Sequence, residues 1–364
     1  MNSKERLITA IQNKKADRLP VTTHHIMQYF LNNYMNGIDS MQFFNHFKLD
    51  PIVWVGDDYY REEDLENWRI SSEEIPNQKY TTQRYTISTP AGKLTACLQS
   101  NQFTTWLSEH LLKNKKDIEI LAKYMPAAFC NKDRINAIYE QNPNVLIRGT
   151  VHGGDIFGQL GCWQDASCMY GIENLIMESY DDAQWVKELL EIFLDRKLKY
   201  VNSLKGVNCD IFELGGGDAS TTVISPNVFN EFVAPYDSKL IEAAHKVGQR
   251  IVYHTCGGMM PILEDIVAMK TDAMETFTPI DMGGDTMLAE AKRRIGSKVC
   301  MIGGFDQFHF FTGCTVKDTR REVRRCFEEA GTDGGFILSP SDHFFDADIE
   351  LIRAFADEAL KCIY

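Results

Sequence analysis

Long apolar runs are missing from the 364-residue sequence, and positive charge is scarce in it. No stretch reaches the roughly 18 apolar residues that a membrane-spanning helix needs. The N-terminal segment MNSKERLITAIQNKKADRLPV is too charged for the core of a signal peptide, so we expect a cytoplasmic protein. Because 38 Lys and Arg residues face 51 Asp and Glu residues, the net charge of −13 argues against nucleic acid or an anionic membrane as a partner.

Several common signatures are absent as well. The ten cysteines form no C-x-x-C pair, so neither a zinc ribbon nor a thioredoxin-like site is indicated. No G-x-G-x-x-G follows the first apolar segment, which weighs against a dinucleotide-binding Rossmann domain. We find no short repeat, low-complexity segment or Pro/Gly/Ser-rich linker, and therefore expect one domain over residues 1–364.

The sequence does contain a regular alternation of short apolar segments with helical patterns. Six such segments lie in the C-terminal two-thirds of the chain, at residues 145–150, 209–214, 250–256, 272–277, 298–302 and 335–340, and two more lie at 18–22 and 51–56. Strands that alternate with helices predict a parallel sheet. Eight of them favour a closed (β/α)8 TIM barrel over an open doubly wound sheet.

One segment of the first half departs from this alternation. Residues 80–99 contain TTQRYTIS and KLTACLQ on either side of a Thr-Pro-Ala-Gly turn, which is typical of a β-hairpin. We expect this hairpin to be an excursion from the barrel and not a separate domain.

The barrel prediction locates the candidate site, because catalytic residues of such barrels follow the C-terminal ends of the strands. The polar residues at those positions are His24, His25, His152, Asp155, Glu213, Asp218, His254, Cys256, Glu275, Asp306, Ser341, Asp342 and His343. Among them we assign substrate contact to His24, His25, His152 and Glu275.

The sharpest local pattern is Tyr253-His-Thr-Cys-Gly-Gly. Residues two apart in an extended segment point to the same side, so His254 and Cys256 can both face the mouth of the barrel. Imidazole and thiolate are ligands that zinc prefers. Other strand ends offer residues to complete the shell, namely Glu213, Glu275, Asp342 and His343. The alternative is that His254 hydrogen-bonds within a packed mouth and Cys256 is inert.

Two further strand ends carry candidate chemistry. Asp342 and His343 can act as a ligand, as a base or as a base-orienting pair, and the alternative is a helix-capping turn with His343 stacked on Phe344. Glu213 precedes three glycines and can be a ligand, a proton donor or a substrate clamp. The alternative for Glu213 is a salt bridge with Arg148 or another basic residue.

Motifs over nearly the whole chain resemble those of the uroporphyrinogen decarboxylase superfamily. They are KERLITAI, DRLPV, SPNVFNEFVAPY, HTCG, IGGFD and GGFILSPS, which begin at residues 4, 17, 225, 254, 302 and 334. The order and spacing of these motifs carry the resemblance, which implies the barrel fold.

True decarboxylases of this superfamily carry an arginine-rich Met-Arg-Gln-Ala-Gly-Arg-Tyr segment that holds the carboxylates of the substrate. This chain has TTHHIMQYF at that position, with no arginine between Arg18 and Arg61. It also has Phe212-Glu-Leu-Gly where the family has Phe-Asp-Ser-Trp. Each missing bidentate arginine forfeits a charge-assisted hydrogen bond. Porphyrinogen decarboxylation is therefore disfavoured.

The sequence is more similar to the cobamide-dependent methyltransferase branch. That resemblance implies a zinc ion at His254 and Cys256, and methyl transfer between a small methylated compound and a corrinoid held by a partner protein. The family's last zinc ligand is usually a cysteine, but this chain has Pro340-Ser-Asp-His there. Asp342 or His343 would have to replace the cysteine, and we assign Asp342 to the metal. An oxygen ligand leaves more charge on zinc, which favours activation of an ether or alcohol oxygen and a demethylase-type first methyltransferase.

Two other functions remain open at this point. One is a metal-free decarboxylase or lyase of a small carboxylic acid, with Glu213 and His343 as its acid and base. The other is a degenerate barrel that holds a corrinoid or tetrapyrrole without chemistry. The oligomeric state is open too, with a homodimer as one option.

Overall fold

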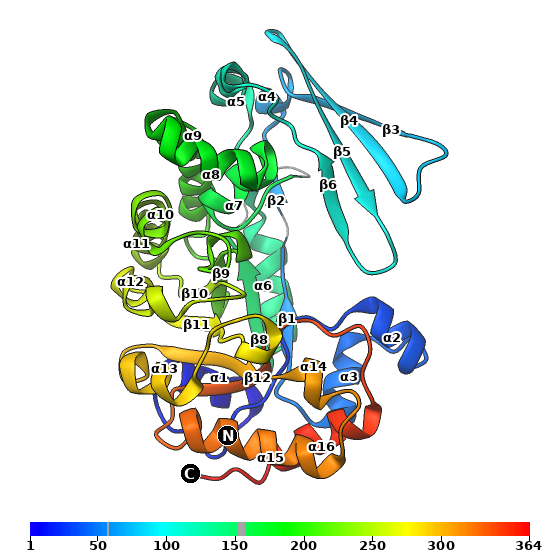
Figure 1. Ribbon diagram of the computed structural model, residues 1–364, viewed down its shortest axis with the longest axis vertical. Coiled ribbons are helices and arrows are strands. Elements are labelled where there is room, and N and C mark those ends of the chain that lie inside the picture. The colour runs from blue at the N-terminus through cyan, green and yellow to red at the C-terminus, as the bar shows by residue number, and fades with distance from the viewer. Residues whose placement is uncertain (57, 152–156) are drawn as a thin grey trace.

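A parallel sheet of seven strands forms the centre of the molecule in the computed structural model, which describes residues 1–56, 58–151 and 157–364 (Figure 1). In spatial order the strands are β1 (Ile52–Trp54), β8 (Leu146–Thr150), β9 (Ile211–Gly215), β10 (Ile251–His254), β11 (Ala273–Thr276), β12 (Cys300–Phe305) and β13 (Phe336–Pro340). Each strand pairs in parallel with the next one. The sheet curls, and its strands from β8 to β13 are almost entirely buried, as two covered faces require.

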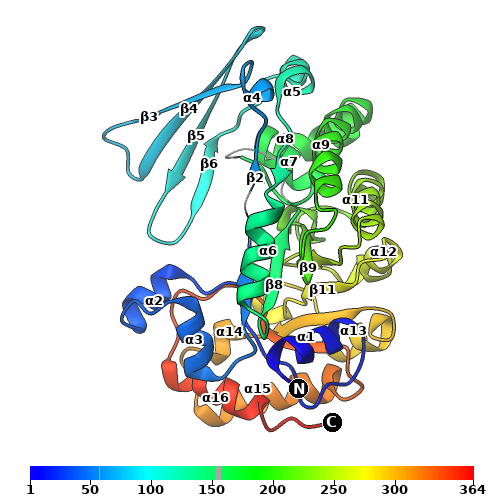
Figure 2. The same cartoon turned by 180° about the vertical axis from the view of Figure 1, so that it is seen from behind.

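Helices cover the outer face of the curled sheet. In the C-terminal half they are α9 (Ala183–Ser203), α10 (Pro226–Val228), α11 (Ala234–Lys246), α12 (Leu263–Ala268), α13 (Leu288–Ile295), α14 (Gln307–Phe310), α15 (Val316–Cys326) and α16 (Ile349–Ala359). Figures 1 and 2 show α9, α11, α12 and α13 in one row along the side of the sheet. In α9, Trp185, Leu189 and Phe193 are buried at a spacing of four residues, so one stripe of the helix faces the core.

The first half of the chain contributes shorter helices. They are α1 (Ser3–Ile11), α2 (Gln28–Tyr34), α3 (Ser40–Phe47), α4 (Glu62–Leu65), α5 (Ile118–Tyr124), α6 (Lys132–Gln141), α7 (Cys162–Tyr170) and α8 (Ile172–Asp181). None of the helices in the described part of the chain combines the length and the apolar character that crossing a membrane requires.

Residues 20–22 lie against the far edge of the sheet, beside β13. Val21 forms an isolated parallel bridge with Leu338, and the amide of Thr22 donates to the Leu338 carbonyl at 3.0 Å. On its other side, the Val21 carbonyl accepts from the amide of Asp50 at 2.7 Å, just before β1. The segment thus contacts both ends of the seven-stranded order.

The predicted parallel α/β architecture is confirmed, and all six strand–helix units of the C-terminal two-thirds are present. The complete eight-stranded barrel is not established, because the first predicted strand, 18–22, forms a bridge and no ladder. Pro20 supplies a physical reason, since proline has no amide hydrogen to continue a ladder. A single domain over residues 1–364 stays a prediction.

A four-stranded antiparallel sheet projects from the body (Figures 1 and 2). Its strands are β3 (Arg69–Glu74), β4 (Thr81–Thr89), β5 (Gly92–Ser100) and β6 (Thr105–Glu109), and a separate pair is formed by β2 (Asp58–Tyr59) and β7 (Phe129–Cys130). The predicted hairpin is β4–β5, and it is confirmed as an excursion from the main sheet. The prediction missed β3 because all six of its residues are exposed and show no alternation.

Asp50 is a buried anchor for the 20–22 segment. Its carboxylate, 0% exposed, accepts hydrogen bonds from Arg6 Nη1 at 2.6 Å and from Arg18 Nη1 at 3.0 Å. It also accepts from the amide of Val21 at 3.0 Å. Breaking a buried charge pair by removing one partner costs several kcal/mol, because the other charges stay buried.

We therefore expect Asp50→Ala to lower the free energy of unfolding by about 3–5 kcal/mol in urea denaturation. The matched control is Asp195→Ala, which removes a carboxylate that is 56% exposed in its pair with Lys199 and should cost less than about 1 kcal/mol. Equal costs for the two variants would contradict the anchoring role of Asp50.

Candidate functional site

The strand register brings three of the strand-end residues to one edge of the sheet. Glu213 of β9 pairs with Val252 of β10, and His254 at the end of β10 pairs with Glu275 of β11. Parallel strands in register present their C-terminal ends at one edge, so residues distant in sequence meet there. Arg148 of β8 points into the same space.

Arg148 connects the two glutamates. Its Nη2 donates to Glu213 Oε2 at 2.6 Å and also to Glu275 Oε1, and its Nη1 donates to Glu275 Oε2 at 2.9 Å. The side chain is 2% exposed, and its guanidinium lies 4.4 Å from the centre of the Trp54 ring. The alternative interpretation of Glu213, a salt bridge with Arg148, is therefore present in the structure.

His24 and His254 complete this buried group. His24 Nε2 lies 3.2 Å from Glu213 Oε2 and 3.3 Å from Glu275 Oε1. His254 Nδ1 lies 2.8 Å from Glu275 Oε1 and 3.6 Å from Glu213 Oε1. Each carboxylate thus faces one guanidinium and two imidazoles, and we call these five residues the paired-charge group.

The pKa values follow from these contacts. Burial opposes the charged form of His24, but the charges of Glu275 and Glu213 outweigh it and raise the pKa of His24. For the same reasons, with Glu213 as the main charge, the pKa of His254 is raised well above its ordinary value. Burial would raise the pKa of Glu213, yet Arg148 and His24 hold it at about 2. At neutral pH both imidazoles of the group therefore favour the protonated form beside ionised carboxylates.

Cys256 lies in the turn that follows β10. Its side chain lies close enough to the imidazole of His254 to be one cause of the raised pKa of that histidine. Gly257 adopts φ 105°, a conformation that favours glycine, so the chain turns sharply just after the thiol. A Cβ atom at Gly217 would lie 2.7 Å from the sulfur. The structure thus places the imidazole and the sulfur side by side, with a glycine backbone leaving room for the sulfur.

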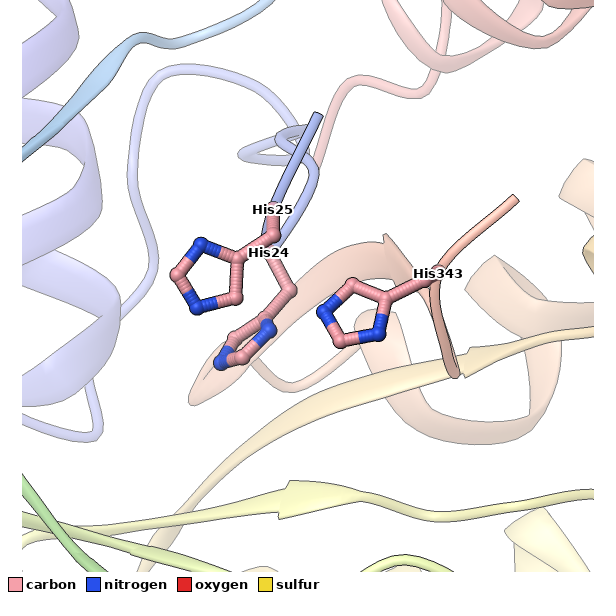
Figure 3. A group of neighbouring side chains, drawn as sticks. All are labelled: His24, His25 and His343. Atoms are coloured by element: carbon pink, nitrogen blue, oxygen red, sulfur yellow. The ribbon is translucent and has the colours of Figure 1, made fainter. Parts of the chain in front are cut away.

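A second group of imidazoles lies next to the first. The rings of His24, His25 and His343 lie next to one another (Figure 3), and one nitrogen of each lies within 4.8 Å of the others. His25 stacks on Trp54 with ring centres 4.1 Å apart. Burial, followed by the charge of His24, lowers the pKa of His25 to about 3 and also lowers that of His343. His25 and His343 are therefore neutral bases at neutral pH.

Asp342 occupies a more open position than the other candidates. Its side chain is 51% exposed, and its Oδ1 accepts from the amide of His343 at 2.7 Å and lies 3.3 Å from His343 Nδ1. Over residues 1–56, 58–151 and 157–364, no group of three potential ligands within 4.8 Å includes Asp342 or Cys256. Asp342 as a ligand shared with His254 and Cys256 stays a prediction.

The remaining strand-end candidates lie elsewhere. His152 and Asp155 fall outside the described residues. Asp306 accepts from the amide of His309 as the cap of α14, and the amide of Ser341 donates to Gln307. Asp218 accepts from Gln164 and from Ser167, away from the paired-charge group.

Two cavities bound the space open to a ligand. One of about 20 Å³ lies below His24 and Arg148 inside the curled sheet, which leaves room for no more than about one water molecule. A groove of about 710 Å³ lies between β5–β6 and α7–α8, and Asp218 and His110 line it. None of the residues of the paired-charge group lines this groove.

Arg148 is the functional residue that the sequence interpretation underrated, since it entered only as a salt-bridge partner. The available signal was one arginine inside the apolar run VLIRGT. A charged residue in such a strand is buried and needs a partner of opposite charge. Trp54 contacts His24, His25 and Arg148.

The curled α/β sheet with charged side chains at its C-terminal edge is the arrangement of a barrel-type enzyme. The chain belongs to the uroporphyrinogen decarboxylase (URO-D) family, whose profile matches residues 155–361. The resemblance inferred from the motifs is confirmed.

Individual relatives are more distant. Methylcobamide:CoM methyltransferase MtaA from Methanosarcina barkeri is 21% identical over 308 residues, which cover 82% of this chain and 81% of that protein. Uroporphyrinogen decarboxylase from Pseudoalteromonas translucida (strain TAC 125) is 26% identical over 169 residues, 44% of each chain. A solved methyltransferase from Methanosarcina mazei superposes with a TM-score of 0.64 at 16% identity, over 99% of this chain and 98% of that one, and so shares the fold.

The charge balance around Arg148 predicts a pH-dependent stability. With Arg148 present, the pKa of Glu213 is lowered to about 2, so its pairing stabilises the fold above the ordinary carboxyl pKa and is lost as the pH falls through 2. In Arg148→Met the carboxylates lose this partner and their pKa values rise. We expect a loss of about 3–5 kcal/mol near pH 8 that shrinks toward pH 5, measured by urea denaturation.

The matched control is Arg196→Met. Arg196 is also buried, but it donates to the backbone carbonyls of Met125, Leu121 and Ala122. Its removal should destabilise the protein by a similar amount at both pH values. The same pH profile for the two variants would show that Arg148 does not set the charge state of the glutamates.

Proposed function

We propose that this protein is a zinc-dependent methyltransferase that moves a methyl group between a small methylated compound and a corrinoid protein. The observation that carries the proposal is the contact between His254 and Cys256 at the end of β10. An imidazole and a thiol in contact at the mouth of such a sheet form the core of a zinc site. The similarity to MtaA, itself described as a methylcobamide:CoM methyltransferase, supports the same activity class.

The residues around His254 fit a metal ligand. Glu275 Oε1 lies 2.8 Å from His254 Nδ1, and a carboxylate on one ring nitrogen commonly orients the other nitrogen toward zinc. His254 Nε2 and Cys256 Sγ would hold the ion, and Asp342 would be the third ligand. Bound zinc would supply Lewis-acid polarisation of the atom that carries the methyl group.

The chain's own charges would prepare the site for this chemistry. Glu213 is ionised beside Arg148, so it accepts hydrogen bonds and holds His24 in place, and it is not itself a proton donor. His343 is a neutral base at the mouth, suited to accept a proton from a substrate or from water. His25, stacked on Trp54, would form the wall against which a small methylated compound binds.

The donor class follows from the third ligand. With Asp342 in place of a cysteine, the zinc would keep more positive charge and would favour an ether or alcohol oxygen over a thiol. The substrate would therefore be a small methyl ether or methanol, and the corrinoid protein the methyl acceptor. The net charge of −13 is compatible with docking to a partner protein that has a basic face.

The fold that we propose with this activity is the complete eight-stranded barrel in one domain. Residues 20–22 would take the eighth position, since they contact β13 on one side and Asp50 on the other.

The metal-free decarboxylase is the weaker candidate. Such an enzyme needs a cation free to bind the carboxylate of its substrate. The buried cations of the site, Arg148 and the imidazoles of His24 and His254, already face Glu213 and Glu275. Binding a substrate carboxylate there would require breaking a buried ion pair.

The experiment measures zinc content by inductively coupled plasma analysis, together with methyl transfer from a panel of methyl ethers to free cob(I)alamin. We expect Cys256→Ser to lose the zinc ion held beside His254 and to lower methyl transfer by at least about 100-fold. Cys314→Ser, which removes a partly exposed thiol that contacts Thr319, should keep both. Turnover that survives Cys256→Ala would favour the metal-free lyase.

A further inference from the structure

We propose that His24, His25 and His343 form a second metal site, which binds a divalent transition ion such as zinc or cobalt. This site is distinct from the pair His254 and Cys256, and it stands whether or not the protein transfers methyl groups. It assigns metal binding to residues that the sequence had assigned to substrate contact and to base catalysis.

The three histidines are brought together by the edge of the sheet. His24 and His25 follow the 20–22 segment, and His343 follows β13. The bridge between Val21 and Leu338 aligns these two segments, so their outgoing loops run side by side. Figure 3 shows the three rings converging on one space from the two loops, with a nitrogen of each within 4.8 Å of the others.

His343 provides an independent sign of a missing ligand. Its Nε2 is buried and has no hydrogen-bond partner in the part of the chain that the structure describes. Its Nδ1 lies 3.3 Å from Asp342 Oδ1. A metal-binding histidine usually has a carboxylate at one ring nitrogen and the metal at the other. A buried polar atom without a partner costs folding free energy, which a bound ion at Nε2 would recover.

The other two rings are also held in place before any ion binds. Trp54 stacks on His25, and its Nε1 donates to the backbone carbonyl of His24 at 3.0 Å. Glu213 and Glu275 hold His24 Nε2 from the opposite side. Since the rings are already ordered, little conformational entropy is lost when they bind an ion.

The neighbouring group of potential ligands is a poorer site. It consists of His24, Glu213, His254 and Glu275, and its carboxylates are already bound by Arg148. A divalent ion there would have to displace a buried guanidinium. The three-histidine group has nitrogen donors alone, which favours zinc, cobalt, nickel or copper over magnesium and calcium. Three protein ligands leave one position open for water or a substrate oxygen, as in catalytic zinc sites.

The test is a titration of the metal-free full-length protein with Co²⁺, followed by visible absorption and metal analysis. A cobalt ion bound by His254 and Cys256 gives a sulfur-to-cobalt charge-transfer band, and one bound by three histidines gives ligand-field bands without it. We expect two ions per chain in the wild type. Cys256→Ser should lose the charge-transfer band and keep one ion with its ligand-field bands.

The variants His25→Ala and His343→Ala should each keep the charge-transfer band and lose the second ion, with at least about tenfold weaker binding. His309→Ala is the control, since that histidine pairs with Asp306 on α14, and it should bind as the wild type does. Thermal melting followed by circular dichroism checks that each variant folds. His25→Gln is a second variant at the same partly exposed position, in case His25→Ala does not fold.

Wild-type cobalt binding in both His25→Ala and His343→Ala would overturn the second site. If the wild type shows no charge-transfer band, the zinc site of the proposed function is contradicted. If His25→Ala and His343→Ala still each lose an ion in that case, the three-histidine site is supported. The two proposals therefore fail on different measurements.

Discussion

The pairing of Arg148 with Glu213 and Glu275 is the constraint on which the whole site depends. Two carboxylates at the strand ends would be unstable when buried without a cation, because the desolvation of each costs several kcal/mol. Arg148 lies on the neighbouring strand β8 and offsets that cost, because its two Nη atoms bind both carboxylates. Because the charges are balanced within the protein, His24 and His254 can be held close to carboxylates at fixed positions.

This internal balance changes what the family's fold can bind. A decarboxylase acting on a polycarboxylate needs cations directed at its substrate, and the segment TTHHIMQYF offers imidazoles instead of arginines. The buried arginine that the site does contain is directed at Glu213 and Glu275. The nitrogen and sulfur donors of this site are the groups that the proposed metal would use.

Much of the fold was predictable from the sequence because its strands are local, continuous apolar runs. The strands from β8 to β13 were each predicted within a few residues, since a strand buried on both faces leaves a clear signal. The outer strand β3, RISSEE, was missed because none of its residues is buried. The 18–22 segment was predicted as a strand and forms a bridge, because Pro20 interrupts the ladder and contact with Asp50 holds it instead.

The site was predictable to a smaller degree, and the difference lies in sequence separation. The contact of His254 with Cys256 could be inferred because the two residues are separated by a single position. The convergence of His25 with His343 depends on the alignment of Val21 with Leu338, which no local pattern reports. The role of Arg148 was hidden for a related reason, since its strand looks like core and its partners come from two other strands.

The departure from the family at Pro340-Ser-Asp-His unites these observations. The resemblance to the methyltransferase branch implies a cysteine ligand in this turn, where the chain has Asp342. Asp342 instead is half exposed and lies beside His343 Nδ1, which leaves the other nitrogen of that ring directed into a buried space. In the proposed assignments, this one replacement would remove a sulfur ligand and would place a carboxylate beside the ring of His343. In both proposals the loop after β13 supplies a ligand, Asp342 in one and His343 in the other, so the residues of this loop would decide which ion binds.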